Sequence, residues 1–357
     1  MSNNQQPWIH SLKLDSTFIL LPPFITLLLV AFLPDEYKSG DAMPALAWVG
    51  LVLLIDVAHV YSTLYRTYFD KDMQQQHRSL LINIPLLAFI GGVLLYTISA
   101  MAFWRIMAYI AVFHFIRQQY GFVRLYGRKE NTPRYSRIID GIAIYAATVY
   151  PILYWHLSGQ RNFDWFVQGD FYYFRSDILL YAGTVVYITA GIVYLVKETV
   201  YSYKSRTFNL PKNMIVAGTW LSWYFGIVHF NGDIAFTALN VISHGIPYMA
   251  LIWVYGKRKT DKQPQQAGSF LRMVFSSYGV VLFLLLIFAL SYLEEGIWDA
   301  LVWNDHRQIF GAFYFMPQIK SSTLLAIIVP LLTLPQLTHY IIDGFIWKVR
   351  SSSELKE

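Results

Sequence analysis

Long apolar stretches alternate with short polar segments along the whole chain. A helix that crosses the roughly 30 Å hydrocarbon core of a membrane needs about 20 mostly apolar residues. Stretches that meet this requirement cover residues 17–33, 44–65, 80–100, 103–123, 138–157, 178–197, 213–230, 233–255, 273–293 and 324–347. The pattern therefore predicts an all-α fold, a polytopic integral membrane helical bundle with about ten transmembrane helices.

The polar segments differ in charge, and this difference predicts how the helices are oriented. Lys and Arg are enriched in short cytoplasmic loops of membrane proteins. Of the 28 basic residues, 21 lie in six segments: the N-terminus, 66–79, 124–137, 197–212, 256–272 and 348–357. We therefore expect both termini to face the cytoplasm.

The organisation along the chain is simple. We expect a single transmembrane domain over residues 1–357, in which a linker-like stretch, 257–269, separates an eight-helix body (1–256) from a two-helix tail (270–350). Two long segments on the opposite side, 163–174 and 294–316, are rich in aromatic residues. Trp and Tyr are favoured at membrane interfaces, so we expect both segments to lie along the interface.

The composition limits the kinds of partner and metal site that the chain can have. Charged residues make up 14% of the chain, against about a quarter in soluble domains, which excludes a water-soluble core. The absence of Cys excludes disulfides, iron–sulfur clusters, thiolate-ligated haem and Cys-based zinc sites. Cytoplasmic loops account for the net charge of +6. The expected partner is therefore the lipid bilayer and not nucleic acid, and any metal must have nitrogen and oxygen ligands.

Four of the predicted spans carry a histidine together with a carboxylate or amide three or four residues away. The pairs are Asp56 and His59, His114 and Gln118, Asn240 and His244, and His339 and Asp343. This spacing places both members on one helix face. Ionisable groups at mid-membrane cost roughly 2.5–3.5 kcal/mol and are functional candidates, although polar residues in spans also form hydrogen bonds that serve packing alone.

The four histidines also match in depth. All four spans run from the outside to the inside, and each histidine lies about 11 or 15 residues from the start of its span, a spread of roughly 6 Å at 1.5 Å per residue. We therefore expect His59, His114, His244 and His339 to converge on a metal. Asp56 and Asp343 are expected as further ligands or as partners of the ligating histidines, and Gln118 and Asn240 as orienting or substrate groups.

One arginine, Arg117, lies inside the fourth predicted span. An unpaired charge at that depth costs several kcal/mol. We expect Arg117 to pair with Asp56 or Asp343, to extend toward the cytoplasmic headgroups near Arg124, or to bind a carboxylate of the substrate.

Neutral imidazoles with carboxylates are typical of non-haem iron sites in helical bundles. The sequence therefore predicts one or two non-haem iron ions and does not assign catalytic residues beyond the ligands. Haem bound axially by two of the histidines is the second interpretation.

The histidine boxes HxxxH and HxxHH of membrane fatty-acid desaturases are absent, since no two histidines lie within four residues of each other. The segments DVAH (Asp56, His59), FHF (His114) and HGIPYMALIW (from His244) resemble the Brp/Blh family of bacterial carotene-cleaving membrane oxygenases. The resemblance implies that His59, His114 and His244 bind iron. The last segment, HYIIDGFIWK, has no counterpart in that family.

Together these features predict a multi-pass oxidoreductase of the bacterial inner (cytoplasmic) membrane. It would be an oxygenase for a lipidic substrate (isoprenoid, carotenoid or fatty acyl), supplied by a separate electron donor. Three alternatives remain open: a haem-binding electron-transfer protein, a transporter with an Asp/His proton relay, and a membrane-bound acyltransferase that uses His244 as a base.

Overall fold

The computed structural model of the chain describes residues 6–265 and 268–347. All regular structure in these residues is helical, with no strand, which confirms the all-α prediction. Seven helices are long and apolar enough to cross a membrane, or up to nine if each of two bent helix pairs is one span. The chain is therefore an integral multi-pass membrane protein. The count of ten spans and the side on which the termini lie remain predictions.

The seven long helices include two that change their winding along their length. The first is Ala45–Arg66, made of α4 (Ala45–Trp48), η2 (Val49–Val57), α5 (Ala58–Ser62) and η3 (Thr63–Arg66). The others are α7 (Arg78–Ile98), α8 (Ala100–Tyr126), α9 (Arg134–Ser158), α10 (Asp177–Ser205), α12 (Asp233–Lys262), and α14 (Val280–Trp298) with η5 (Asp299–Trp303).

The two bent pairs break beside prolines. The first joins α1 (Leu12–Asp15) and η1 (Ser16–Leu20) to α2 (Pro22–Ala31) at 46°, and the second joins α16 (Ser322–Leu332) to α17 (Leu334–Ile346) at 41°. Proline has no backbone N–H, so the hydrogen bond that would continue the preceding helix is missing at its position. Pro22 and Pro335 stand at the starts of the second helices, which accounts for both bends.

The predicted span 213–230 corresponds to α11 (Leu210–Trp223) continued by η4 (Tyr224–His229), which is not among the nine. The remaining helices are short: α3 (Asp35–Ser39), α6 (Lys71–Gln76), α13 (Ser269–Val274), α15 (Arg307–Phe310) and η6 (Gly311–Phe313).

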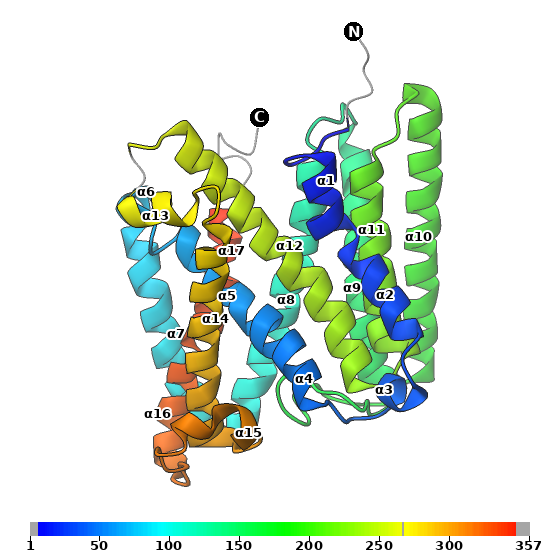
Figure 1. Cartoon of the computed structure of the whole chain (residues 1–357). Coiled ribbons are helices and arrows are strands. Elements are labelled where there is room, and N and C mark those ends of the chain that lie inside the picture. The colour runs from blue at the N-terminus through cyan, green and yellow to red at the C-terminus, as the bar shows by residue number, and fades with distance from the viewer. Residues whose placement is uncertain (1–5, 266–267, 348–357) are drawn as a thin grey trace. The chain divides into compact units, whose positions relative to one another are not determined.

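The chain divides into two compact units, and α8 and α12 each contribute residues to both. Among the described residues, the first unit contains 6–43, 112–247 and Trp347. In it α9 packs along α10 and α11, and α2 packs on α11 (Figure 1). Glycine permits these close approaches: a Cβ atom at Gly183 of α10 would lie 2.6 Å from the Leu153 side chain.

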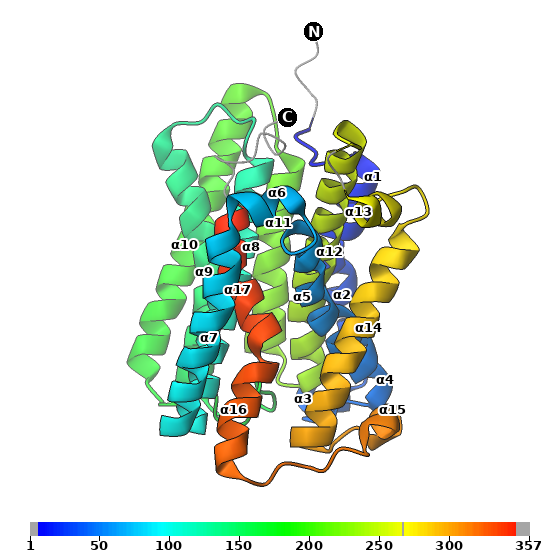
Figure 2. The same cartoon turned by 90° about the vertical axis from the view of Figure 1, so that its left-hand side faces the viewer.

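The second unit contains residues 44–111, 248–265 and 268–346, so the region expected as a two-helix tail packs with earlier helices. Here α7 lies beside α16 and α17, while α14 packs on α5 and η2 (Figure 2). A Cβ atom at Gly92 of α7 would lie 2.9 Å from Pro330 of α16, so glycine allows this contact.

The ninth predicted span, 273–293, is displaced in the structure. Its helix begins at Val280 and continues to Trp303, so Glu294, Glu295 and Asp299 lie in a helix and not in the outer segment to which the sequence pattern assigned them. The helix ends where the Asp299 carboxylate accepts hydrogen bonds from the backbone N–H groups of Asp305 and His306, both at 2.9 Å. Hydropathy missed this end because two adjacent carboxylates interrupt the apolar pattern.

The segment 163–174 packs inward. Phe163 and Phe171 are 4% and 6% exposed, and the centroids of both rings lie 4.7 Å from that of Trp155. The carboxylate of Asp170 accepts hydrogen bonds from the N–H groups of Phe166 at 2.6 Å and Val167 at 3.2 Å. Burial raises the pKa of Asp170 to about 6. The segment is therefore an ordered cover of the first unit and not only an interfacial loop.

Candidate metal centre

The second unit buries a pair of histidines. His59 on α5 and His339 on α17 are 1% and 2% exposed, and their ring centroids lie 5.1 Å apart at an interplanar angle of 77°. Each ring offers a nitrogen to a metal, and these two nitrogens lie within 4.8 Å of one another. The structure therefore brings together two predicted ligands that are 280 positions apart in the chain.

The position of His59 depends on the winding of η2. This segment is a π-helix, whose wider turn is rare and often occurs at functional sites. It ends at Val57, directly before the α-helical turn that holds His59. Nδ1 of His59 lies 3.2 Å from the Ile55 carbonyl oxygen and 3.8 Å from the half-buried Asp56 carboxylate. A carbonyl only accepts, so Nδ1 carries the proton and Nε2 is the candidate ligand atom.

His339 is oriented by a chain of hydroxyl groups. Its Nδ1 lies 2.6 Å from the Thr63 hydroxyl, which lies 2.8 Å from the Tyr248 hydroxyl. Tyr248 donates a hydrogen bond of 2.6 Å to the Asp343 carboxylate. If every proton points toward the carboxylate, His339 donates from Nδ1, and Nε2 is again the candidate ligand atom. Metal-binding histidines commonly donate their second N–H in this way.

The first unit buries the other pair. His114 on α8 and His244 on α12 are 4% and 1% exposed, with ring centroids 5.0 Å apart at an interplanar angle of 80°. Their candidate ligand nitrogens also lie within 4.8 Å of one another. Phe115 stacks on His244 with a centroid distance of 3.6 Å and an angle of 8°, which fixes the plane of that ring.

Two glutamines attach α8 to α12 beside this pair. Gln119 donates to the Ser243 carbonyl at 3.2 Å, and Gln118 donates to the His244 carbonyl at 2.9 Å. Pro247 lacks the N–H that would normally bond to the Ser243 carbonyl, so Gln119 supplies the missing donor. Gln118 therefore positions the backbone of His244, whereas the sequence pattern placed it near the imidazoles.

Asn240 is 2% exposed and donates to the Phe236 carbonyl of its own helix at 2.8 Å. A Cβ atom at Gly226 of η4 would lie 3.0 Å from the Asn240 amide nitrogen, so the glycine leaves room for this side chain. Asn240 is thus a packed polar group one helical turn before His244.

The ring separations can be compared with those of metal ligands. With a metal–nitrogen bond of about 2.1 Å, an imidazole centroid lies about 3.2 Å from the metal, so two adjacent ligands have centroids about 4.5–5.2 Å apart and two opposite ligands about 6.4 Å. The observed 5.1 Å and 5.0 Å fit adjacent ligands on one ion. These centroid distances are too short for the two histidines of one pair to be axial ligands on opposite sides of a haem.

Arg117 lies elsewhere. Its side chain is exposed, donates to the Tyr145 hydroxyl at 3.1 Å and lines a cavity that also contains Arg124. This location matches the expectation that it extends toward Arg124.

Buried charge in the first unit is concentrated in a separate ion network. Lys212, 1% exposed, contacts Glu130 at 2.8 Å and Glu198 at 2.6 Å. Lys197 forms ion pairs with Asp140 and Glu198. Each carboxylate of the network lies within 4 Å of a lysine amine, so the network is held together by its own ion pairs.

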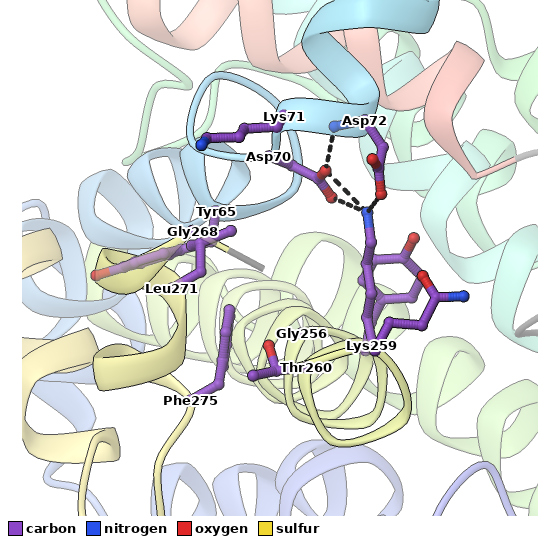
Figure 3. Close-up of a pocket in the computed structure, with 12 residues that line it drawn as sticks. Tyr65, Asp70, Lys71, Asp72, Gly256, Lys259, Thr260, Gly268, Leu271 and Phe275 are labelled. Atoms are coloured by element: carbon purple, nitrogen blue, oxygen red, sulfur yellow. Dashed lines mark hydrogen bonds and ion pairs between the residues drawn. The ribbon is translucent and has the colours of Figure 1, made fainter. Parts of the chain in front are cut away.

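A small cavity in the second unit surrounds another ion pair. Figure 3 shows Lys259 directed toward Asp70 and Asp72, and its Nζ lies 2.7 Å from a carboxylate oxygen of each. The cavity measures about 20 Å³, room for about one water molecule, so it cannot hold an organic substrate.

Sequence reasoning missed four residues that position the histidines: Thr63, Tyr248, Phe115 and Gln119. Two of them had a detectable pattern, because Thr63 and Tyr248 each follow a candidate histidine by four residues. A hydroxyl at that spacing faces the same side of the helix as the histidine.

Comparison with known proteins gives no assignment: no protein-family model matches the chain, and no curated protein or solved structure matches it significantly.

Proposed function

We propose that this protein is a membrane-embedded non-haem iron oxidoreductase, an oxygenase for a lipidic substrate, with His59, His114, His244 and His339 as the iron ligands. The observation that carries the proposal is that each unit buries two of these histidines at the separation of adjacent metal ligands. Iron bound there would supply the activation of O₂.

The surroundings of the histidines support a binding role over packing alone. At His59 and His339, a carbonyl and a hydroxyl chain ending at Asp343 engage Nδ1, which directs Nε2 toward a ligand. Packing alone does not require that both histidines of a pair are engaged through Nδ1.

The first unit supports the exclusion of water. The Trp165 ring of the 163–174 segment lies 5.2 Å from Phe115, which in turn stacks on His244. This aromatic cover shields one side of the imidazole, and a water-poor site protects reactive species from side reactions.

The substrate class follows from the setting. A site within membrane helices is reached most directly from the bilayer, so we propose an isoprenoid, carotenoid or fatty acyl substrate, a separate electron donor, and a bacterial inner membrane as the location. The resemblance of the DVAH and HGIPYMALIW segments to carotene-cleaving oxygenases supports the first two substrate classes over the third.

Spectroscopy of the protein purified in detergent tests the proposal. We expect one or two irons per chain, no Soret band, and, after reduction and addition of nitric oxide, the S = 3/2 electron paramagnetic resonance signal of non-haem iron. A strong Soret band would overturn the proposal in favour of haem. Proton transport or acyl transfer by metal-free protein would overturn it in favour of a transporter or an acyltransferase.

A further inference from the structure

A basic cavity of about 730 Å³ lies between α8 and α9 in the first unit. Its lining contains four arginines and no acidic residue among the described residues, namely Arg117, Tyr120, Arg124, Arg134, Arg137, Ile138, Gly141, Ile142 and Tyr145. The four guanidinium groups give the cavity a positive potential, which attracts an anion.

Helical spacing builds the cavity from two faces. On α8, Arg117, Tyr120 and Arg124 are separated by three and four residues and therefore share a face. On α9, Arg134 and Arg137 occupy the first turn of the helix, and Gly141 lies one turn further along. A Cβ atom at Gly141 would lie 3.5 Å from the Tyr120 ring, so α8 and α9 pack closely here.

The arginines and the apolar side chains occupy different parts of the α9 wall. Arg134 and Arg137 stand at the helix start, in the segment 124–137 that charge distribution predicts to be cytoplasmic, and Ile138 and Ile142 extend from there toward the membrane interior. Both isoleucines are exposed. Such a wall suits an amphiphile with a charged head and an apolar tail.

We propose that this cavity binds the phosphate headgroup of an anionic phospholipid of the cytoplasmic leaflet. Arginine recognises phosphate oxygens through its planar array of N–H donors, and basic pockets between transmembrane helices bind anionic headgroups. The exposed isoleucines favour a lipid over a soluble phosphate, because they offer a surface for acyl chains. The proposal is independent of the metal centre.

Native mass spectrometry of delipidated protein tests this site, with phosphatidylglycerol as the probe and phosphatidylcholine as the neutral reference. We expect phosphatidylglycerol to bind at least tenfold more tightly. One basic residue near a membrane surface contributes roughly fivefold in affinity, so the double variant Arg124→Gln/Arg137→Gln should bind phosphatidylglycerol about 20-fold more weakly.

A matched control removes the same charge elsewhere. The double variant Arg78→Gln/Arg272→Gln alters two exposed arginines that do not line the cavity, and it should bind phosphatidylglycerol within twofold of the wild type. Equal weakening in both double variants would overturn the site. Inorganic phosphate or pyrophosphate that displaces the lipid at micromolar concentration would overturn the choice of a lipid.

Discussion

The Lys212 network and the histidine pairs bury polar groups in different ways. Around Lys212, amines and carboxylates form ion pairs with contacts of 2.6–2.9 Å. Around His59 and His339, a carbonyl and a hydroxyl contact the rings, and two ring nitrogens lie within 4.8 Å of each other. Burial of polar groups alone therefore does not mark a binding site. The ion pairs around Lys212 hold the fold together. The neutral imidazole nitrogens of the histidine pairs are suited instead to bind a cation.

The substitution Lys212→Met should have the largest effect, and on stability alone. It removes the amine that pairs with the buried Glu130 carboxylate and one of the two amines that pair with Glu198, which keeps Lys197; breaking such a buried pair typically costs about 3–5 kcal/mol. Unfolding by SDS in mixed micelles measures the loss, with the exposed Lys204→Met variant as the control. The iron content of the folded fraction should stay at the wild-type value. Loss of iron from folded Lys212→Met protein would contradict the claim that the Lys212 network serves stability and not iron binding.

The substitution Asp343→Asn should lower iron affinity and leave stability nearly unchanged, the reverse of Lys212→Met. Tyr248 donates to this carboxylate, and changes of such outer partners typically lower metal affinity 10–100-fold. Competition with a chelator measures the iron affinity, and stability without metal should change little, because the amide oxygen still accepts the hydrogen bond of Tyr248. Asp261→Asn on α12, which removes an exposed carboxylate paired with Lys257, is the control and should leave affinity unchanged. An unchanged affinity in Asp343→Asn would show that the hydroxyl chain does not act on a metal.

The substitution Thr63→Val keeps the shape of the side chain and removes the hydroxyl between His339 and Tyr248. We expect iron affinity to fall about tenfold, at the lower end of the effects seen for outer partners. Thr199→Val is the matched control, because Thr199 is exposed and its hydroxyl donates to the Leu195 carbonyl of its own helix. Equal iron affinity in the two variants would contradict the proposed orientation of His339.

The smallest effect is expected at Phe115, whose ring orients His244 by stacking. Aromatic pairs contribute about 0.5–1.5 kcal/mol, so Phe115→Leu should weaken iron binding about threefold. Phe113→Leu on the same helix, where the side chain is 59% exposed, serves as the control. A loss greater than 100-fold at Phe115 would indicate collapse of the pair and not a change of ring orientation.

Much of the fold could be predicted from the sequence because hydropathy depends on local composition. Helices such as α7 and α10 contain long apolar runs, and their spans were predicted to within a few residues at the start. The continuation of α14 through Glu294 and Glu295 was not predictable from hydropathy, because two adjacent acidic residues give the same polar signal as a loop. Pro335 indicated a kink in the last span but not its angle, and the bend at Pro22 was not predicted.

The site was predictable in its residue types and less so in its contacts. The three- and four-residue spacings indicated His59 with Asp56 and His339 with Asp343, and these pairs lie 3.8 Å and 3.7 Å apart. The contact between Thr63 and His339 joins residues 276 positions apart, and no local pattern can indicate it. Gln118 was expected as an orienting or substrate group, and it donates to the backbone carbonyl of His244.

The most direct test of the metal centre is the iron content per chain of the wild type and of the variants His59→Ala, His114→Ala, His244→Ala and His339→Ala, measured by inductively coupled plasma mass spectrometry on folded protein. We expect one or two irons in the wild type and a loss of half or more of that iron in every variant. Wild-type iron content in all four variants would show that the four histidines do not bind the iron.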